Sequence, residues 1–492
     1  MSRRLGAELR LGVMIGWALV GPVVAGTPEE AERQYRVARR LAADGSADAR
    51  VALQKVIELD PGGPLVDDAL VEQALLERLP RWPEELGAID PASCARALEL
   101  LDRAIDGQAD GDRLPEARYY RALLHLEPLP THDAARARID LITVATDPRP
   151  SDWSHAARYA GGWLAAATGR RERAESAYGR LLVDAAGSLA ATRAAVALAR
   201  SRLRDGDPGG AALLLDRALR EGVDERLEAR ALRELAVRLA LGGAAALPGD
   251  ARTVIASTGV RALSAAAPTA RGVLVADARS GAVLEFGGDG RAIGSWSVPQ
   301  ASALAVDRSG RVFAANHESV LRLRAGGATS AVASVGEFAS PAAMAVDPLG
   351  RVWLLDRRGD RVGKIEPGAA LPEPYWTSKE HKLASLALDG TTLVAIDTRG
   401  RDVVTLDGTN GVERAGAPDL QRPLAVAVDA AGRVAVLDAK GPAVRLHASG
   451  GQPWVTIPCK PAGVERPTAV GFAADGALQL FDESTGGWVR LR

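Results

Sequence analysis

The stretch ASALAVDRSGRVFAAN, residues 301–316, returns forty residues later as PAAMAVDPLGRVWLLD, residues 341–356. In both copies apolar residues alternate over a short run, and the run ends at an Asp-x-x-Gly sequence. Such alternation predicts a β-strand, and Asp followed three residues later by Gly is typical of a tight turn. A second apolar run follows each turn. The stretch therefore predicts two antiparallel strands joined by a turn.

This pair of strands belongs to a repeat that fills the C-terminal half of the chain. Related runs begin at residues 262, 303, 343, 385, 425 and 469, about forty residues apart. Each unit holds three clear strands and a weaker fourth. A single four-stranded unit cannot bury both of its faces, whereas units packed in a ring bury each other. The sequence therefore predicts a radial β array.

The units resemble NHL repeats, most closely in ALAVDRSGRVFAAN, AMAVDPLGRVWLLD and AVAVDAAGRVAVLD. The resemblance covers residues 251–492 and implies a six-bladed β-propeller. The first unit departs from the pattern because it lacks the Asp-x-x-Gly turn. Propellers host many unrelated activities, so the resemblance implies a fold and leaves the function open.

The last unit has room for only three strands before the sequence given ends at Arg492. The β-favouring run ARTVIASTG stands just before the first unit and has no unit of its own. We expect a strand at 252–257 to close the last blade, with Thr253–Ser257 paired beside GWVRLR. Val254→Pro is then expected to lower stability by roughly 2–4 kcal/mol, because proline cannot donate a hydrogen bond to the neighbouring strand.

Residues 28–241 show a different periodicity. Ala and Leu recur at helical spacing in stretches such as RALELLDRAIDG and AALLLDRALREG, which predicts amphipathic helices. The region resembles tetratricopeptide repeats, best over 29–61 and 156–222, and this resemblance implies a helical solenoid. Residues 80–93 look like an inserted loop, and 242–250 a linker. The expected fold class is a multidomain α + all-β protein: a TPR-like α-helical repeat solenoid followed by a six-bladed NHL-like β-propeller at 251–492.

Residues 1–25 have the pattern of a signal peptide. Arg3, Arg4 and Arg10 precede an uncharged apolar run, and Val23 and Ala25 suit a cleavage site. We therefore expect an exported protein, periplasmic or secreted, in a bacterial envelope. An uncleaved N-terminal anchor is the alternative, because the lengths of signals and membrane-spanning helices overlap. Any membrane contact is expected only through this segment.

Composition and cysteine content exclude some classes of partner and site. The formal net charge is −1 and only 4% of residues are aromatic, so no nucleic-acid partner is expected. Cys94 and Cys459 lie in different predicted domains, and a disulfide between them is not expected. None of the six histidines stands in a metal-binding spacing, so we expect no metal and no cofactor.

The repeated aspartates are the first candidates for chemistry. Asp307, Asp347, Asp356 and Asp438 could form a catalytic or calcium-binding set. Their spacing instead places each at the start of a turn, where a carboxylate accepts backbone N–H groups. We therefore expect them to be structural, and no catalytic residue is assigned.

Other side chains are candidates for contact with a partner. Arg33, Arg36 and Arg40 recur on one helix face and could meet acidic groups, although such a face is more often simply solvated. Asn316 and His317 stand in a loop between strands and are the remaining partner-binding candidates.

Two functions are open at this point. The first is a non-catalytic scaffold that binds a protein or peptide partner through a helical-repeat groove and a propeller face. The alternative is a propeller-type lyase, lactonase or hydrolase with a helical targeting domain. A pair of aromatic residues at helical spacing, Tyr159 and Trp163, is read as helix packing and not as a ligand cage.

Overall fold

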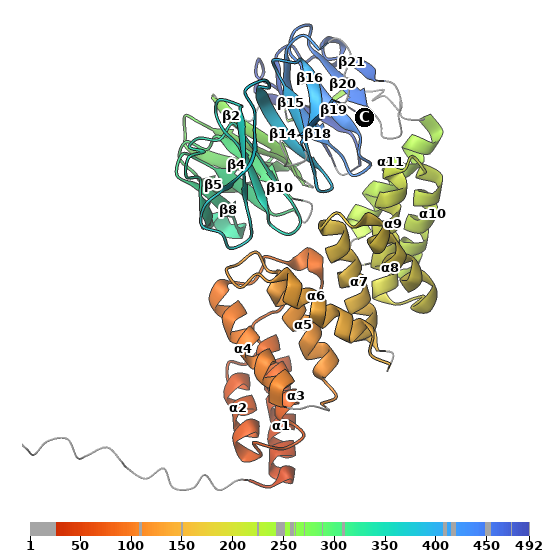
Figure 1. Ribbon diagram of the computed structural model, residues 1–492, viewed down its shortest axis with the longest axis vertical. Helices are drawn as coiled ribbons and strands as arrows, with labels where there is room; N and C mark the ends of the chain where they lie inside the picture. Colours follow the sequence, from red (N-terminus) through yellow and green to blue (C-terminus); the bar gives the residue numbers. More distant parts are fainter. Residues whose placement is uncertain are drawn as a thin grey trace, which may run out of the picture. The chain divides into compact units, whose positions relative to one another are not determined.

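The computed structural model describes residues 26–107, 111–148, 151–223, 226–242, 251–255, 260, 262–269, 271–287, 289–307, 310–406, 411–414, 420–447, 454–473 and 475–491. An α-helical N-terminal region precedes six four-stranded sheets (Figure 1). This confirms the α + all-β multidomain class. The predicted signal peptide, 1–25, lies outside the described residues, as does the predicted linker 242–250 after its first residue. Within the described ranges, no helix has both the length and the apolar character needed to cross a bilayer.

Helix ends follow the expected capping chemistry. Thr27 and Glu30 form a reciprocal capping box at the start of the first helix, and Gly222 ends the tenth helix in a left-handed conformation. The eleven helices of the described chain are α1 (Pro28–Ala43), α2 (Ala49–Leu59), α3 (Val66–Leu75), α4 (Pro91–Gly107), α5 (Leu114–Leu126), α6 (Ala134–Ala145), α7 (Asp152–Ala167), α8 (Arg171–Asp184), α9 (Leu189–Arg204), α10 (Pro208–Glu221) and α11 (Arg226–Gly242).

The chain forms two compact units whose boundary falls inside the helical region. The first unit contains the chain up to Leu79 together with Arg96–Ala117. The second contains Pro80–Ala95 and Arg118–Arg492, so the later helices and the whole β region share one unit. The change from helix to strand between α11 and the first strand is therefore not a boundary between compact units.

Each of the six sheets is one blade of four antiparallel strands. The blades, each listed from its inner to its outer strand, are β2 (Leu263–Pro268), β3 (Gly272–Asp277), β4 (Ala282–Gly287), β5 (Ala292–Ser297); β6 (Ala303–Val306), β7 (Val312–Ala315), β8 (Ser319–Leu323), β9 (Thr329–Ser334); β10 (Ala343–Val346), β11 (Val352–Leu355), β12 (Arg361–Ile365), β13 (Glu373–Thr377); β14 (Leu383–Asp389), β15 (Thr392–Asp397), β16 (Asp402–Leu406), β17 (Val412–Arg414); β18 (Pro423–Val428), β19 (Val434–Asp438), β20 (Ala443–His447), β21 (Val455–Pro458); and β22 (Pro467–Phe472), β23 (Leu478–Asp482), β24 (Gly487–Leu491), β1 (Ala251–Ile255).

The blades form a closed six-bladed propeller. The inner strands contact one another in the cyclic order β2, β6, β10, β14, β18, β22 and back to β2. A cluster of buried apolar side chains lies between each pair of adjacent blades; between the last and first blades it includes Val273, Val275, Phe286, Phe481 and Trp488. The recurring alternation thus gives each blade two apolar faces, and the ring buries both.

Strand β1 is the outermost strand of the last blade. It pairs antiparallel with β24, with Ala251 opposite Leu491 and Thr253 opposite Val489. The strand begins one residue before the predicted 252–257 segment, and residues 256 and 257 lie outside the described residues. The register shifts between Thr253 and Ile255, so Val254 lies at an irregularity of the ladder. Because proline is tolerated at bulges, Val254→Pro is a poor test of this pairing.

Candidate functional site

The turn that follows the inner strand has the same chemistry in three blades. Asp307 accepts a 2.8 Å hydrogen bond from the backbone N–H of Arg311, and its other carboxylate oxygen accepts from the Arg311 guanidinium. Asp347 with Arg351, and Asp429 with Arg433, repeat this arrangement; their carboxylates accept the backbone N–H at 2.9 Å. The hydrogen bonds from backbone N–H groups that were predicted for the carboxylates of Asp307 and Asp347 are therefore confirmed. Burial raises the pKa of both carboxyl groups, and the neighbouring guanidinium groups oppose that effect.

In two other blades, an arginine from elsewhere in the chain forms the ion pair near this turn. Blade four has the turn DGTT and no arginine at the equivalent position. There, Arg204 of α9 forms an ion pair with Asp389, with 2.8 Å between Nη2 and Oδ1. In blade six, Arg490 of β24 forms the ion pair with Asp475. Blades two to six thus each have an Asp–Arg ion pair near this turn, but the positions of the two residues in the chain differ, and in blade six Ala473 stands where blade two has Asp307.

The helical segments of the second unit contact the propeller at these turns. Arg311 donates a 3.2 Å hydrogen bond to the carbonyl of Leu86, which lies in the predicted inserted loop 80–93. Arg351 donates a 2.8 Å hydrogen bond to the carbonyl of Ala167 at the end of α7. The third contact is the ion pair from Arg204 of α9. Arginines of the repeated turn therefore also hold helices over the propeller face.

A cavity of about 1820 Å³ lies between this face and the helices. Its propeller side is formed by the inner strands of all six blades, which present mostly small apolar residues. Its helical side includes Tyr159 and Trp163 of α7 and Arg200 of α9. We call this cavity the chamber. Its walls come from segments distant in sequence, which only the closed ring and the later helices bring together.

Most charged groups of the helical wall are paired with one another. The hydroxyl of Tyr159 donates to the carboxylate of Glu84, and Arg193 binds the same carboxylate at 3.1 Å. Arg200 forms an ion pair with Glu228. Tyr159 is buried and its ring lies 5.6 Å from that of Tyr178 of α8, as predicted for helix packing, but Tyr159 and the half-buried Trp163 both also line the chamber.

Asn316 belongs to a second set of turns, at the opposite end of the second strand of each blade. Its side-chain oxygen accepts hydrogen bonds of 2.9 Å from the N–H groups of Glu318 and Ser319. Carboxylates bind backbone N–H groups at the same position in the other five blades: Asp277, Asp356, Asp397, Asp438 and Asp482. Asn316 thus has a structural use. His317 is exposed and contacts the carboxylate of Glu318 at 3.2 Å.

The arginines proposed from the sequence lie on α1 in the first unit. Arg33, Arg36 and Arg40 are all exposed. Arg36 lies 3.6 Å from Glu32, and Arg33 donates a 3.4 Å hydrogen bond to the carbonyl of Glu29. In the described structure this face is exposed to solvent, and the contacts of Arg33 and Arg36 are with glutamates of the same helix.

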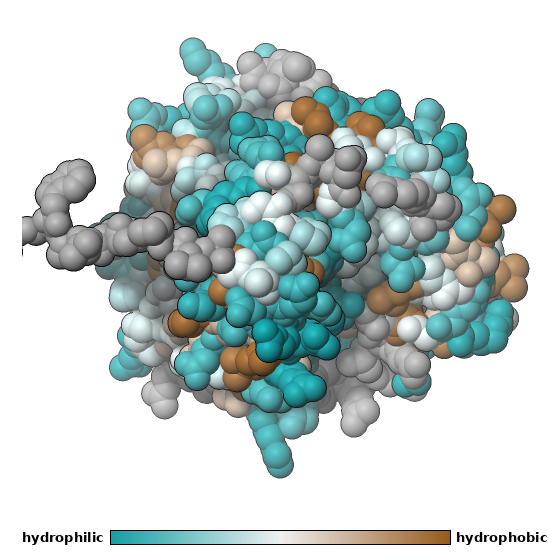
Figure 2. Space-filling model, turned by 90° about the horizontal axis from the view of Figure 1, so that it is seen from below, coloured by the Kyte–Doolittle hydropathy of each residue, from teal (hydrophilic) through white to brown (hydrophobic). Residues whose placement is uncertain are grey.

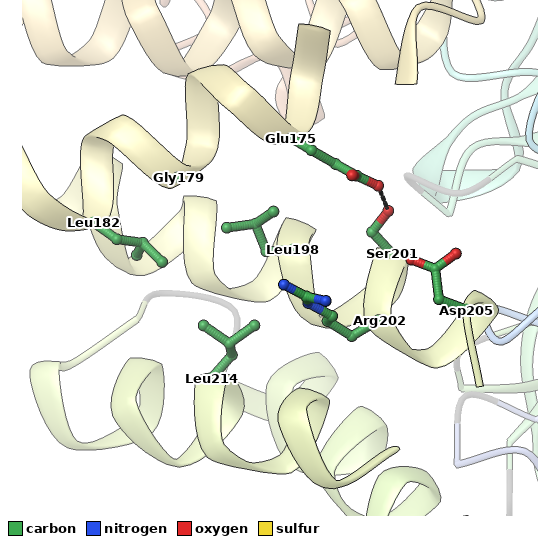
Figure 3. A pocket seen from close by; sticks show the side chains of 8 residues that line it. All are labelled: Glu175, Gly179, Leu182, Leu198, Ser201, Arg202, Asp205 and Leu214. Carbon is green, nitrogen blue, oxygen red and sulfur yellow. Dashed lines mark hydrogen bonds between the residues drawn. The ribbon is translucent and has the colours of Figure 1, made fainter. Parts of the chain in front are cut away.

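A smaller cavity of about 310 Å³ lies among α8, α9 and α10. Figure 3 shows Ser201 pointing towards Glu175, with Arg202 between Leu198 and Leu214. The hydroxyl of Ser201 donates to Glu175, which also accepts a 2.7 Å hydrogen bond from Arg171. No histidine lines this cavity, so nothing at the site resembles a serine nucleophile with its base.

Few large apolar side chains are exposed in the described part of the chain. Figure 2 shows a face on which hydrophilic side chains predominate and hydrophobic patches are small and separate. Large exposed apolar side chains in the described chain are Val37, Val51, Ile139, Ile142, Val183, Leu213, Ile293 and Leu371. The chamber is therefore a stronger candidate for binding than the outer surface.

Both cysteines are buried and free in the structure. Burial raises the pKa of Cys94 and of Cys459 to about 11, which disfavours the reactive thiolate. Among the described residues, no three His, Cys, Asp or Glu side chains are grouped so that they could hold a metal ion.

The chain matches no protein-family model and no curated protein. About half of the chain is similar to several solved structures. They include a gluconolactonase from Xanthomonas campestris (18% identity, 50% of this chain, 90% of that chain, TM-score 0.39), hydrazine synthase from Kuenenia stuttgartiensis (12%, 48%, 97%, 0.36) and virginiamycin B lyase from Staphylococcus aureus (13%, 47%, 80%, 0.35). These low scores assign no activity to this chain.

Proposed function

We propose that this protein is a non-catalytic binding protein that holds a segment of a protein or peptide partner in the chamber. The observation that carries the proposal is the size and composition of the chamber. Pockets for small molecules usually measure about 300–1,000 Å³. A cavity of about 1820 Å³, lined by six inner strands and by helices, suits a longer and partly apolar segment.

The state of the charged groups also supports binding over catalysis. Glu84 is bound by Tyr159 and Arg193, and Asp307 and Asp347 are bound by their own arginines. A general base or nucleophile needs a lone pair directed at substrate, and these carboxylates direct theirs at protein donors. The alternative, a propeller-type lyase, lactonase or hydrolase, would need a free group or a metal that these pairings do not supply.

The finer family assignments are part of the same proposal. We infer blades of the NHL type from the repeated Asp-x-x-Gly turn, and helices of the tetratricopeptide type from the packing of α7 against both α8 and α9. The N-terminal pattern supports export to a bacterial envelope, with the partner in the periplasm or outside the cell. N-terminal sequencing of envelope-fraction protein should then begin near Gly26, whereas intact Met1 in cytosolic protein would contradict export.

A photo-crosslinking amino acid at position 163 tests the binding site, because Trp163 lines the chamber. We expect crosslinking, in the native envelope, to a defined partner segment that mass spectrometry can identify. Ser264→Trp should narrow the chamber and weaken the crosslink, because Ser264 is an exposed residue of β2 in its wall. Ile293→Trp is the matched control, since Ile293 is exposed on β5 of the same blade and does not line the chamber.

Elemental analysis of protein purified without chelator separates the two functions. The binding proposal expects no stoichiometric zinc, calcium or iron. One tightly bound ion per chain, or a crosslink yield in Ser264→Trp equal to that of the Ile293→Trp control, would overturn it.

A further inference from the structure

The chamber extends furthest outward at blade six. In blades two to five, its lining reaches no further than the first residue of the second strand. In blade six it reaches Gln479 on β23 and Trp488, Val489 and Arg490 on β24. Val489 packs towards blade five, whereas the other three share the face towards blade one, where Val273 on β3 also lines the chamber. We call this extension the seam fissure. It lies beside the blade that β1 completes.

Three polar groups in the seam fissure have no hydrogen-bond partner. They are Oε1 of Gln479, the indole N–H of Trp488 and the Nε–H of Arg490, and all three atoms are closed off from solvent. Gln479 lies directly opposite Arg490 in the ladder, and Trp488 is two residues before Arg490. Side chains at these positions share one face of the blade. Gln479 is only 7% exposed.

The opposite wall cannot satisfy these groups. Blade one presents Val273, Val275 and Phe286 to this side of blade six. A buried donor or acceptor without a partner loses its hydrogen bonds to water and gains nothing in return. A ligand that supplied the missing hydrogen bonds would therefore gain binding free energy from them.

The chemistry of the fissure favours a neutral amide. Trp488 and Arg490 offer donors, and Gln479 offers an acceptor. An amide presents a carbonyl and an N–H on adjacent atoms, so it can accept and donate together. A carboxylate is less suitable, because Asp475 already neutralises Arg490 and Gln479 Oε1 would face a second acceptor.

We propose that the seam fissure binds a neutral amide, whose carbonyl accepts hydrogen bonds from Trp488 and Arg490 and whose N–H donates to Gln479. Binding requires the Gln479 side chain to turn, because the three atoms are closed in the unliganded protein. An apolar substituent on the amide would lie against Val273, which lines the chamber at this place. The seam fissure is an extension of the chamber, but amide binding there does not require the partner segment proposed for the chamber.

4-Methylpentanamide, which has one amide and an apolar tail, is a suitable probe, and 4-methylpentanoate, which has no amide, is its carboxylate counterpart. Saturation-transfer NMR on the full chain should show saturable binding of the amide, about tenfold tighter than the acid. Gln479→Leu should weaken amide binding about tenfold, the effect of roughly one lost hydrogen bond. Trp488→Phe should weaken it too. Trp376→Phe is the control, because the Trp376 indole N–H is also buried without a partner but lies outside the fissure.

Thermal unfolding of the same variants separates a binding role from a structural one. Removing a buried group without a partner should leave the Tm of Gln479→Leu equal to that of wild type or higher. The peptide Ac-Ala-Ala-Gln-Ala-Ala-NH2 distinguishes an amide carried by a peptide from a free small amide. Absence of saturable amide binding to wild type, equal binding of the acid, or unchanged binding in both Gln479→Leu and Trp488→Phe would overturn the proposal.

Discussion

Glu127 provides the sharpest test of how the helices are held against the propeller. It follows α5 and is fully buried. One of its carboxylate oxygens accepts a hydrogen bond from the N–H of Gly87, and the other has no partner. The carbonyl of Gly87 in turn accepts from Arg322 of blade two. The perturbation is Glu127→Gln, which keeps an acceptor for Gly87 and removes the negative charge.

The magnitude follows from the pKa of Glu127. Burial raises this pKa from its ordinary value of 4.5 to about 7, against the opposing effects of the Gly87 hydrogen bond and of Arg311, Arg322 and Arg324. One pKa unit corresponds to about 1.4 kcal/mol, so the charged form destabilises the folded protein by about 3 kcal/mol.

The direction of the Glu127 pKa shift determines how the stability difference depends on pH. A carboxyl whose pKa is raised on folding contributes stability below pH 4.5, and this contribution is lost as the pH rises through about 7. Wild type and Glu127→Gln should therefore be equally stable near pH 4.5. At pH 8.5 the variant should be the more stable by about 3 kcal/mol.

The assay is urea unfolding of both proteins at several pH values, with the difference in unfolding free energy as the readout. Taking the difference cancels groups common to both, such as His132, whose pKa is lowered chiefly by burial. Glu99→Gln, at an exposed position of α4, is the control and should give a difference near zero at every pH. A variant less stable than wild type at pH 8.5 would refute the reasoning, because the arginines would then stabilise the carboxylate more than burial destabilises it.

Three further predictions concern the turns and the closing strand. Arg433→Met should lower the unfolding free energy by about 3–5 kcal/mol, because it leaves the buried carboxylate of Asp429 uncompensated; an unchanged urea midpoint would contradict this. Arg204→Met should cost only about 1 kcal/mol, because its ion pair is partly exposed, and a double-mutant cycle with its aspartate partner should show coupling instead of additive effects. Arg252 and Thr253 are adjacent in the edge strand β1, so the N–H of one points towards β24 and the N–H of the other points away. Of Arg252→Pro and Thr253→Pro, one should therefore lower Tm clearly and the other little. Similar Tm values for both variants would argue against the pairing.

The propeller could be predicted from the sequence because its signals are local. Alternating apolar residues specify each strand, and the Asp-x-x-Gly turns specify how consecutive strands connect. The structural reading of Asp307 and Asp347 rested on the same short-range chemistry, in which a carboxylate binds N–H groups a few residues away. The last unit contains only three strand-like runs, and this indicated that a segment before the first blade supplies its fourth strand.

The candidate site was not predictable in the same way. Its walls combine six inner strands with α7 and α9, and no periodicity in the sequence records which helix lies over which blade. The residues chosen from the sequence, Arg33, Arg36, Arg40, Asn316 and His317, do not line the chamber. Asn316 was a candidate because it stands in a loop between strands, but its amide oxygen makes the backbone contacts that aspartates make in the other blades.

The arginines beside the inner-strand turns of blades two to five show which contacts the sequence determines and which the tertiary structure determines. In blades two, three and five the sequence alone determines it, because the arginine is four residues after its aspartate. In blade four the sequence shows only its absence, and the folded chain supplies Arg204 from a helix far away in the sequence. A buried carboxylate needs a counter-charge wherever one can reach it, and which residue reaches it depends on packing between distant segments.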